Sequence, residues 1–522
     1  MAAANGYTED VLARLQEYFS LGAPWQRTLW SVGPAFALRE LIESADGVQN
    51  GALSAKALKR HAESVGRMLS DNPAAGEANA RRELLVLLTR DVSAGGVNYQ
   101  ELQLWLEDVE EHGLNRWAVA VAQPDKPSRE QFARAIACEL FREGFSAQRL
   151  QPWIARMRTG TEVITEQDLV SSTQALIAPG PEDHEVLLTF EQPLPRSVSR
   201  PPQAIDAPAV AGWLTAHEFG RIRQHGGLLL KISARDRYTA AQLGADIADR
   251  LQARASVGTR HDLRFHDMIY VAGHSRAIAT RRSRRAEVRA LERQGRLLDL
   301  EASDSIDQAL ELLSNLNTAP APVAAAAGWS AVESLLSGPG DDDKVITAER
   351  LANLVACSWP RAELTSIAWA RIKQTTDPAS SIVSELAGFG TNRERAERVL
   401  AAIVSDEALG LSSPAERLAL TRMKKLVAAP RRELLAVRDQ ASDALRRLYR
   451  QRNLVVHGGM TAGFGLVSAL RTAAPLVGAG LDRVAHAALT TQREPLEIAA
   501  RAQLEIERAG TQDAPLLTRM LE

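Results

Sequence analysis

The sequence has little of what defines several large protein classes. It contains 2 cysteines and 5% aromatic residues among 522 residues. Cys138 and Cys357 lie far apart, each in an apolar, helix-like segment. This arrangement argues against a disulfide framework or a cysteine-rich zinc site and fits a reducing compartment. The net charge is −2, so any binding to nucleic acid has to use a local basic patch.

Signals for export or membrane insertion are also missing. Residues 1–6 lack the basic region and following apolar run of a signal peptide. The most apolar late stretch, residues 461–481, is interrupted by Arg471 and Pro475 and is too broken to be a membrane span. We therefore expect a cytoplasmic protein that makes no use of a membrane.

The composition that is present, 45% hydrophobic and 24% charged residues, is typical of a soluble globular protein. The length predicts two to four domains. We expect a mainly α, multidomain protein whose N-terminal region, 1–180, is helical. A small α/β unit (181–280), a basic helix with a linker (281–319) and a second helical domain (320–522) follow. The first region fits a sensor or docking module as well as a plain scaffold.

The predicted α/β unit begins after Pro179-Gly180-Pro181. Apolar runs predict strands at 184–191, 227–233 and 263–272, and an amphipathic pattern predicts a helix at 239–255. Eight arginines then crowd one stretch, from Arg276 to Arg296, which we expect to be helical.

From Pro320 onward the pattern is helical to the end of the chain. Thr391 with Glu394, and Ser413 with Pro414 and Glu416, predict capped helix starts. The expected helices are 322–337, 345–357, 361–373, 391–405, 414–427, 430–457, 461–489 and 495–508.

The helix expected at 430–457 places a charge where apolar residues are expected. Its apolar positions follow the helical period and define one buried face: Leu434, Val437, Ala441, Ala444, Leu445, Leu448 and Val455. Arg452 falls on this face, where a guanidinium is costly unless something pairs with it. His457 follows at the helix end, before two glycines that can adopt a left-handed stop.

The segment Arg452-Asn453-Leu454-Val455-Val456-His457 resembles the R-x4–6-H signature of HEPN ribonucleases. Upstream, the segment 329–336 (WSAVESLL) resembles the opening helix of the ApeA-like HEPN subgroup of bacterial defence proteins. The resemblance covers about 200 residues, from Pro320 to the end. It implies a helical bundle with the signature near the end of a long helix. It also implies a dimer whose two arginine–histidine pairs line one cleft.

The spacing by itself is not specific, since Arg254 with His261 and Arg260 with His266 also satisfy it. An alternative explanation is an arginine paired with a core carboxylate and a histidine acting as a helix C-terminal cation. Positions five apart on a straight helix point about 140° apart. The pair therefore converges only if the helix loosens before Gly458 or if a second subunit completes the site.

Other residues are candidates for support. Asn453, four residues before His457, could orient its ring, and Arg450 is a second possible phosphate ligand beside Tyr449. Glu333 is either the partner of Arg452 or a surface glutamate beside Trp329. A weaker RNA-binding candidate is the basic run Arg281, Arg282, Arg284 and Arg285. Acidic neighbours also fit a solvated helix face there.

The function that these features predict is endoribonuclease activity without a metal or another cofactor. A histidine can transfer the protons and an arginine can hold the phosphate. The expected partners are RNA (tRNA or single-stranded RNA), a second copy of the chain, and a phage-derived trigger or another defence protein. The resemblance implies a toxic effector in anti-phage defence. The alternative is a non-catalytic scaffold subunit. Gly273-His274-Ser275 imitates a hydrolase elbow, but the predicted sheet is too small for that fold.

Overall fold

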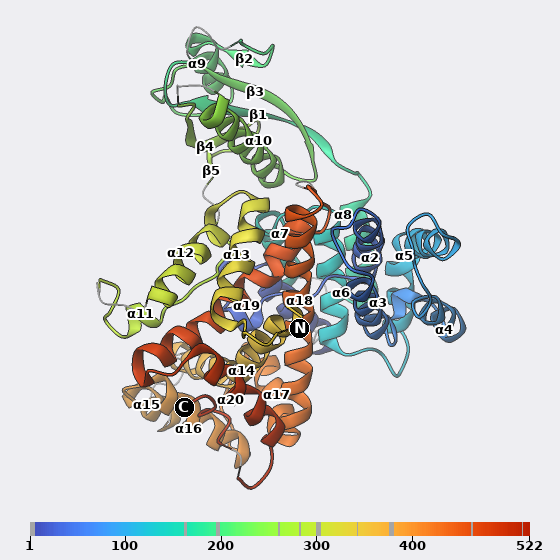
Figure 1. Ribbon diagram of the computed structural model, residues 1–522, viewed down its shortest axis with the longest axis vertical. Coiled ribbons are helices and arrows are strands. Elements are labelled where there is room, and N and C mark those ends of the chain that lie inside the picture. Colours follow the sequence, from blue (N-terminus) through green and yellow to red (C-terminus); the bar gives the residue numbers. More distant parts are fainter. Residues whose placement is uncertain are drawn as a thin grey trace.

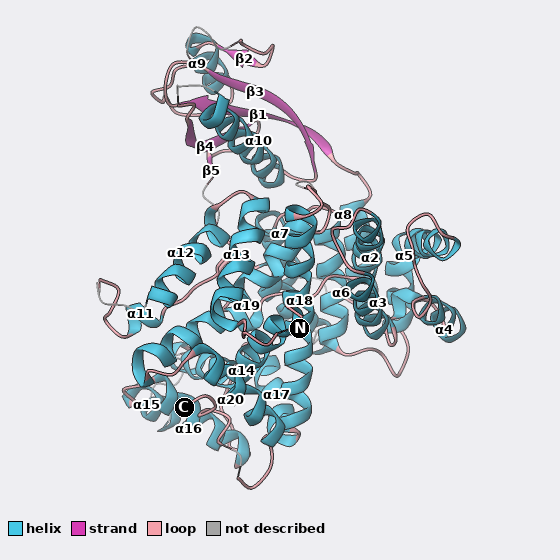
Figure 2. Cartoon of the chain, in the orientation of Figure 1, coloured by secondary structure: helices cyan, strands magenta, loops and turns pink. Residues whose placement is uncertain are grey.

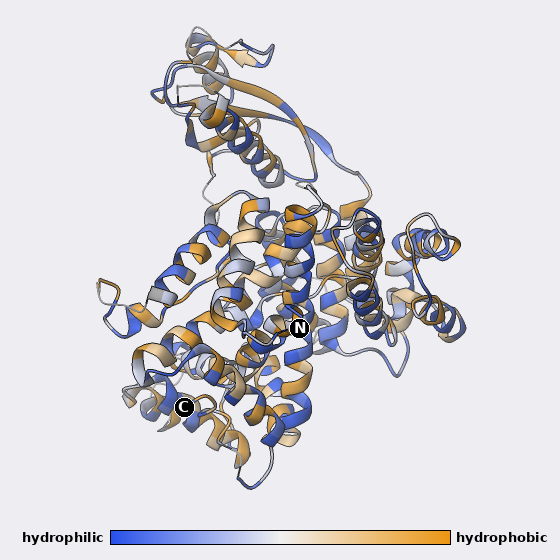
Figure 3. Ribbon diagram, viewed as in Figure 1, coloured by the Kyte–Doolittle hydropathy of each residue, from blue (hydrophilic) through white to orange (hydrophobic). Residues whose placement is uncertain are grey.

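A computed structural model describes residues 6–160, 164–194, 199–258, 262–280, 283–298, 304–341, 343–374, 381–460, 463–513 and 515–522. In these ranges the protein is mainly α-helical, as the sequence predicts, and its strands form one five-stranded sheet. Figure 2 shows the sheet at one end of a large helical body. Figure 3 shows hydrophilic and hydrophobic stretches alternating within single helices, as expected of amphipathic helices.

The first helices share one hydrophobic cluster, built from residues between Tyr7 and Val170. Ser128 and Gln131 form a capping box at the start of α6. The elements are α1 (Gly6–Phe19), η1 (Trp25–Arg27), α2 (Pro34–Gln49), α3 (Ala55–Leu69), η2 (Pro73–Ala75), α4 (Ala78–Leu87), α5 (Val97–Val121), α6 (Arg129–Arg142), α7 (Ala147–Thr159) and α8 (Glu166–Ile177).

The α/β unit contains the three expected strands and two short ones. Its elements are β1 (Glu182–Phe190), β2 (Ala204–Ile205), α9 (Ala207–Ala216), β3 (Gly227–Ala234), α10 (Arg237–Gly258), β4 (Phe265–Val271) and β5 (Ile278–Ala279). The strand order is β2-β3-β1-β4-β5 with antiparallel neighbours. Because side chains alternate along a strand, Val186 and Leu188 join the cluster with α10, whereas Leu187 joins α9 on the opposite face.

Two residues between β3 and α10 connect this unit to the first helices. Asp236 accepts hydrogen bonds from the backbone N–H of Thr239 at 2.9 Å and of Ser146 at 2.8 Å, so it caps α10 while it also holds the start of α7. Arg235 pairs with Glu143 and donates to the carbonyl of Ile177 at 2.6 Å. These contacts set the position of the unit at the end of the helical body (Figure 1).

The arginine-rich stretch differs from the expected basic helix. Residues 283–289 are not helical, and α11 covers only Ala290–Arg293, before α12 (Asp304–Thr318). The segment packs through Ala286 and Ala290 against the C-terminal helices. Arg284 donates to the carbonyl of Leu316 at 2.8 Å. These tertiary contacts, which the local sequence does not encode, replace the backbone hydrogen bonds of a helix.

The C-terminal helices share a second, larger cluster. They are α13 (Ala321–Leu336), α14 (Val345–Lys373), α15 (Ser381–Gly388), α16 (Asn392–Val404), α17 (Pro414–Ala428), α18 (Pro430–Val456), α19 (Leu466–Thr491) and α20 (Pro495–Arg508). The two helices expected at 345–357 and 361–373 are one helix, which continues through Pro360. Helix α19 begins at Leu466 rather than 461, and α15 was not expected.

The two capped starts that the sequence predicts in this region have different outcomes. Thr391 and Glu394 form a capping box on α16, as predicted. Ser413 precedes α17, but its side chain makes no capping bond. Its expected partner, Glu416, instead pairs with Arg27 at 2.7 Å. Glu416 accepts two hydrogen bonds from the buried guanidinium of Arg27, at 2.7 and 3.0 Å. In such a pair both partners are ionised, whereas a capping bond to a backbone N–H has one ionised partner, so the tertiary pair is favoured.

A buried ion-pair network joins the N-terminal and C-terminal helices. Glu363 of α14, whose side chain is fully buried, pairs with Arg27 of η1 at 3.1 Å and with Arg422 of α17 at 2.5 Å. Burial by itself would raise the pKa of Glu363, but Arg422 and Arg27 together hold that pKa below its usual value. The carboxylate therefore stays ionised between two cations contributed by different parts of the chain.

We expect Glu363→Gln to destabilise the protein by about 3–5 kcal/mol, because it removes the fully buried carboxylate that Arg27 and Arg422 share. The free energy of unfolding, measured with urea, gives this value. The matched control is Glu385→Gln, which removes an exposed partner of Arg398 and should change stability by less than about 1 kcal/mol. Equal effects of the two variants would contradict the buried role of Glu363.

The same carboxylate should make stability depend on acid. Because the folded-state pKa of Glu363 is lowered from 4.5, its contribution is complete above pH 4.5 and is lost as the pH falls toward the folded-state pKa. Urea unfolding between pH 7 and pH 3 should therefore show a smaller loss of stability for Glu363→Gln than for the wild type. An identical slope would exclude this linkage.

Candidate functional site

The arginine and the histidine of the expected motif meet at the end of α18. The helix ends at Val456, and His457 is its C-cap with φ −101° and ψ −30°. Arg452 Nη1 donates to His457 Nε2 at 3.1 Å. The arginine side chain is long enough to reach across the angle between two helix positions that lie five residues apart. Within one chain the two groups therefore converge, and the imidazole accepts at Nε2.

Asn453 takes a different position from the expected one. Its Oδ1 accepts from Arg452 Nη1 at 2.9 Å, so its side chain orients the arginine rather than the imidazole. Its backbone carbonyl accepts from the amide of His457 at 2.9 Å. Asn453 is buried and His457 is exposed. The site thus combines a rigid inner residue with a solvent-facing imidazole.

Arg452 is only half-buried, in contrast to the expectation that it lies on the buried face. Its Nε is shielded from solvent and has no hydrogen-bond partner, and no carboxylate pairs with Arg452 among the residues that the structure describes. In the last three turns of α18, Arg446, Arg447 and Arg450 each pair with a glutamate. Arg452 is therefore the cation of this segment that keeps its capacity to bind an anion.

The buried arginines of α18 are Arg447 and Arg450. Arg447 Nε lies 2.8 Å from Glu40 of α2, and Arg450 lies 3.8 Å from the same carboxylate. Burial, against the opposing charge of Glu40, lowers the pKa of Arg450 to about 10. Arg450 thus belongs to the contact with α2 and does not extend into the solvent beside His457 as a second phosphate ligand.

A buried histidine of α3 lies near Arg447 and Arg450. His61 Nδ1 lies 3.0 Å from Ser44 Oγ. Burial and the nearby Arg450 and Arg447 lower the pKa of His61 well below its usual value. The imidazole is therefore neutral here and adds no further charge to the cations of α18.

The N-terminal helices also hold the loop that follows the motif. Glu43 of α2 accepts from Gln451 Nε2 at 2.9 Å and from the backbone of Phe464 at 3.1 Å. Leu454 packs with Ala52 and Leu53 in a small hydrophobic cluster. These contacts hold the end of α18 against the N-terminal helices, while the side chain of His457 remains exposed to solvent.

The other two supporting candidates, Tyr449 and Glu333, form no hydrogen bond or ion pair with Arg452 or His457 in the described part of the chain. Tyr449 stacks obliquely on Trp329, with ring centroids 4.8 Å apart, and so joins α18 to α13. Glu333 is half-buried on α13 and forms no ion pair with Arg452 in the described ranges. Its predicted role as the partner of Arg452 has no support from the geometry.

The weaker basic candidates lie on the segment between the sheet and α12. Arg281 and Arg282 fall outside the described residues. Arg284 is half-buried and donates to main-chain carbonyls, and Arg285 has a positive φ of 65°. Farther along, Arg289 pairs with Glu287 and Arg293 with Asp482, both at 2.6 Å. Paired charges and backbone contacts dominate this stretch, which agrees better with a structural role.

Neither a metal site nor a membrane helix accompanies the motif in the described part of the chain. There, no group of three or more His, Cys, Asp and Glu side chains is arranged to hold a metal ion. No described helix is both long and apolar enough to cross a bilayer. Both cysteines are buried free thiols.

Comparison with known proteins gives no match to a family model, to a curated protein or to a solved structure. The site is therefore interpreted from its own geometry.

Sequence reasoning missed the residues that position the motif. Glu40 lies 407 residues before Arg447 and Glu43 lies 408 residues before Gln451, and nothing in their local pattern indicates a partner there. The one available signal was the density of arginines on α18, several of which fall on neither the apolar stripe nor a fully exposed face. Such residues require a carboxylate from elsewhere when a second domain covers them.

The glycine after His457 should be sensitive to substitution. A Cβ at Gly458 would lie 2.7 Å from the carbonyl oxygen of Leu454 and 3.0 Å from Ala52 Cβ. We expect Gly458→Ala to destabilise the protein by about 1–3 kcal/mol through overpacking, as measured by urea unfolding.

Gly459 provides the matched control. It has a positive φ of 63° and an added Cβ would meet nothing within 4 Å. Asparagine tolerates this left-handed conformation, so Gly459→Asn should cost less than about 1 kcal/mol. A larger effect for Gly459→Asn than for Gly458→Ala would contradict the packing of the helix end against Ala52.

Proposed function

We propose that the protein is an endoribonuclease that cleaves RNA without a metal cofactor, using Arg452 and His457. The observation that carries this proposal is the contact, at 3.1 Å, between an exposed imidazole and a guanidinium that pairs with no carboxylate of the described ranges. A structural arginine at the end of a helix would be expected to pair with an acid, as its neighbours on α18 do.

The proposed reaction uses the ribose 2′-hydroxyl as nucleophile. The 2′-oxygen attacks the adjacent phosphorus, a 2′,3′-cyclic phosphate forms, and the bond to the 5′-oxygen breaks. One proton leaves the 2′-hydroxyl and one is delivered to the 5′-oxygen. His457 is suited to these transfers because an imidazole gains and loses protons near neutral pH.

Arg452 is suited to hold the phosphate. A guanidinium binds two phosphate oxygens at once and offsets the charge that develops on them. When a phosphate takes the donors of Arg452, the hydrogen bond to His457 Nε2 breaks and that nitrogen becomes available for proton transfer. Asn453, which holds Nη1 at 2.9 Å, positions the arginine in this scheme.

The wider setting is part of the same proposal. The substrate is tRNA or single-stranded RNA, the enzyme acts as a homodimer or larger homo-oligomer in the cytoplasm, and a phage-derived trigger or a defence protein activates it. The role as a toxic effector rests on the resemblance of residues 452–457 and 329–336 to HEPN proteins. The N-terminal helices that contact α18 are the part of the chain through which a trigger could act.

We expect wild-type protein to cleave labelled tRNA or single-stranded RNA in EDTA and to leave cyclic-phosphate ends. His457→Ala and Arg452→Ala should each lower the rate by about 100-fold or more, because each removes a group that acts in the transition state. Gel analysis of the products and of their ends measures both effects.

Matched controls for this assay are His112→Ala and Arg432→Ala, which change exposed residues of α5 and α18 and should cleave like the wild type. Cleavage that survives loss of both Arg452 and His457 would exclude them as the catalysts. Wild-type protein that cleaves nothing, and whose expression does not slow host growth, would favour the non-catalytic scaffold.

Substitution of lysine for Arg452 should separate charge from geometry. Arg452→Lys keeps the positive charge but loses the planar fork that holds two oxygens, so the cleavage rate should fall by about tenfold or more. Initial rates on one labelled RNA, with Arg432→Lys as the control, measure the change. Full activity of Arg452→Lys would count against a phosphate-binding role for Arg452.

A further inference from the structure

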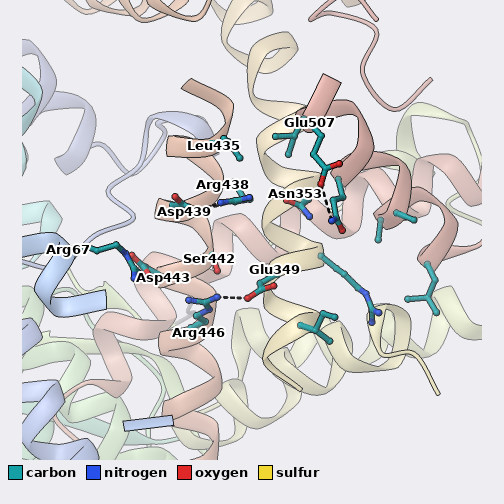
Figure 4. A pocket seen from close by; sticks show the side chains of 17 residues that line it. Arg67, Glu349, Asn353, Leu435, Arg438, Asp439, Ser442, Asp443, Arg446 and Glu507 are labelled. Carbon is teal, nitrogen blue, oxygen red and sulfur yellow. Dashed lines mark hydrogen bonds and ion pairs between the residues drawn. The ribbon is translucent and has the colours of Figure 1, made fainter. Parts of the chain in front are cut away.

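A cavity of about 520 Å³ lies between three C-terminal helices, away from the Arg452–His457 pair. Its walls come from α14, α18 and α20, and Arg67 of α3 reaches it from the N-terminal helices. Figure 4 shows side chains of α14 and α18 facing each other across this space. This volume lies within the usual range of ligand sites, about 300–1,000 Å³.

The charges around the cavity are balanced. Four arginines and four carboxylates line it, which gives no net charge. They are also paired: Arg446 lies 2.5 Å from Glu349, and Arg438 lies 2.6 Å from Asp439. A polyanion would have to break several of these pairs, so the lining favours a ligand that is polar but carries no net charge.

Two neutral polar side chains of the lining are left without partners. Asn353 of α14 is 7% exposed, and its carboxamide has no hydrogen-bond partner among the described residues. Ser442 Oγ, on the facing side of α18, is buried and likewise has none. Of the two, Ser442 Oγ is the one shielded from solvent, and unpaired polar groups of that kind are uncommon and cost free energy. The carboxamide of Asn353 lines the cavity, so a ligand there can pair with it.

The chemistry of the lining indicates what this ligand is. A carboxamide presents a donor beside an acceptor, which matches the edge of a nucleobase. Ile346, Leu435 and Leu496 provide apolar surface for a flat ring. Gln503 and Glu507, hydrogen-bonded to each other at 3.2 Å, offer the acceptors that commonly bind ribose hydroxyls.

We propose that this cavity binds a nucleoside moiety, with Asn353 pairing with the base edge. The moiety comes either from a free nucleoside or from one unstacked nucleotide of an RNA strand, whose phosphates would stay outside the charge-paired lining. The proposal goes beyond the ribonuclease activity and does not depend on it, since binding is measured without any cleavage. In both cases the ligand contacts α18, the helix that ends in Arg452 and His457, and Arg67 of the N-terminal helices.

Isothermal titration calorimetry on the full chain tests the proposal with adenosine, guanosine, cytidine and uridine as probes. At least one of them should bind the wild type, and Asn353→Leu should weaken that binding tenfold or more. Asn353→Asp, which keeps the shape of the side chain but replaces its donor, should change which nucleoside binds best. Asn79→Leu, at an exposed position of α4, is the control and should bind like the wild type.

Further titrations identify the source of the moiety. A short single-stranded oligoribonucleotide that binds more tightly than the nucleosides, and loses affinity in Asn353→Leu, would assign the cavity to an RNA nucleotide. Binding of free nucleosides alone would assign it to a small molecule. The proposal is overturned if no nucleoside or oligonucleotide binds the wild type. It is also overturned if Asn353→Leu and Asn353→Asp, both folded by circular dichroism, bind the probes unchanged, or if only a zwitterion such as glutamine binds.

Discussion

The contact between the N-terminal and C-terminal helices depends on charges that neither part can bury by itself. Glu363 lies between Arg27 and Arg422, and Glu40 lies beside Arg447 and Arg450. A buried carboxylate or guanidinium without its partner costs several kcal/mol. The two sets of helices are therefore most stable when packed together, and the position of α18 follows from this contact.

This arrangement separates the arginines of α18 by their roles. Arg446, Arg447 and Arg450 are paired with glutamates and hold helices together, whereas in the described part of the chain the side chain of Arg452 is hydrogen-bonded only to Asn453 and His457. The loop after His457 is held by Glu43, so the imidazole is placed on a rigid support. A rigid support for a solvent-facing pair is what proton transfer and phosphate binding require.

The same helices that form the core also leave space between them. Helices α14, α18 and α20 face one another through charged, polar and apolar residues around the cavity. The charges are paired with one another, and Asn353 lines the cavity without a hydrogen-bond partner among the described residues. Helix α18 lines this cavity and also carries the Arg452–His457 pair. A ligand in the cavity would therefore contact the same helix that ends in this pair.

Most of the local secondary structure follows from patterns in the sequence alone. The 3.6-residue period predicted α18 within a residue of its end, apolar runs predicted the three long strands, and Thr391 with Glu394 predicted the start of α16. The sequence also placed His457 at a helix end, five residues after Arg452. Which arginines of α18 are buried depends on the tertiary structure, because the carboxylates that pair with them come from α2, more than 400 residues away. Glu416 pairs with Arg27 rather than capping the start of α17 for the same reason. The partner of a buried charge depends on which groups lie near it in space and not on which lie near it along the chain.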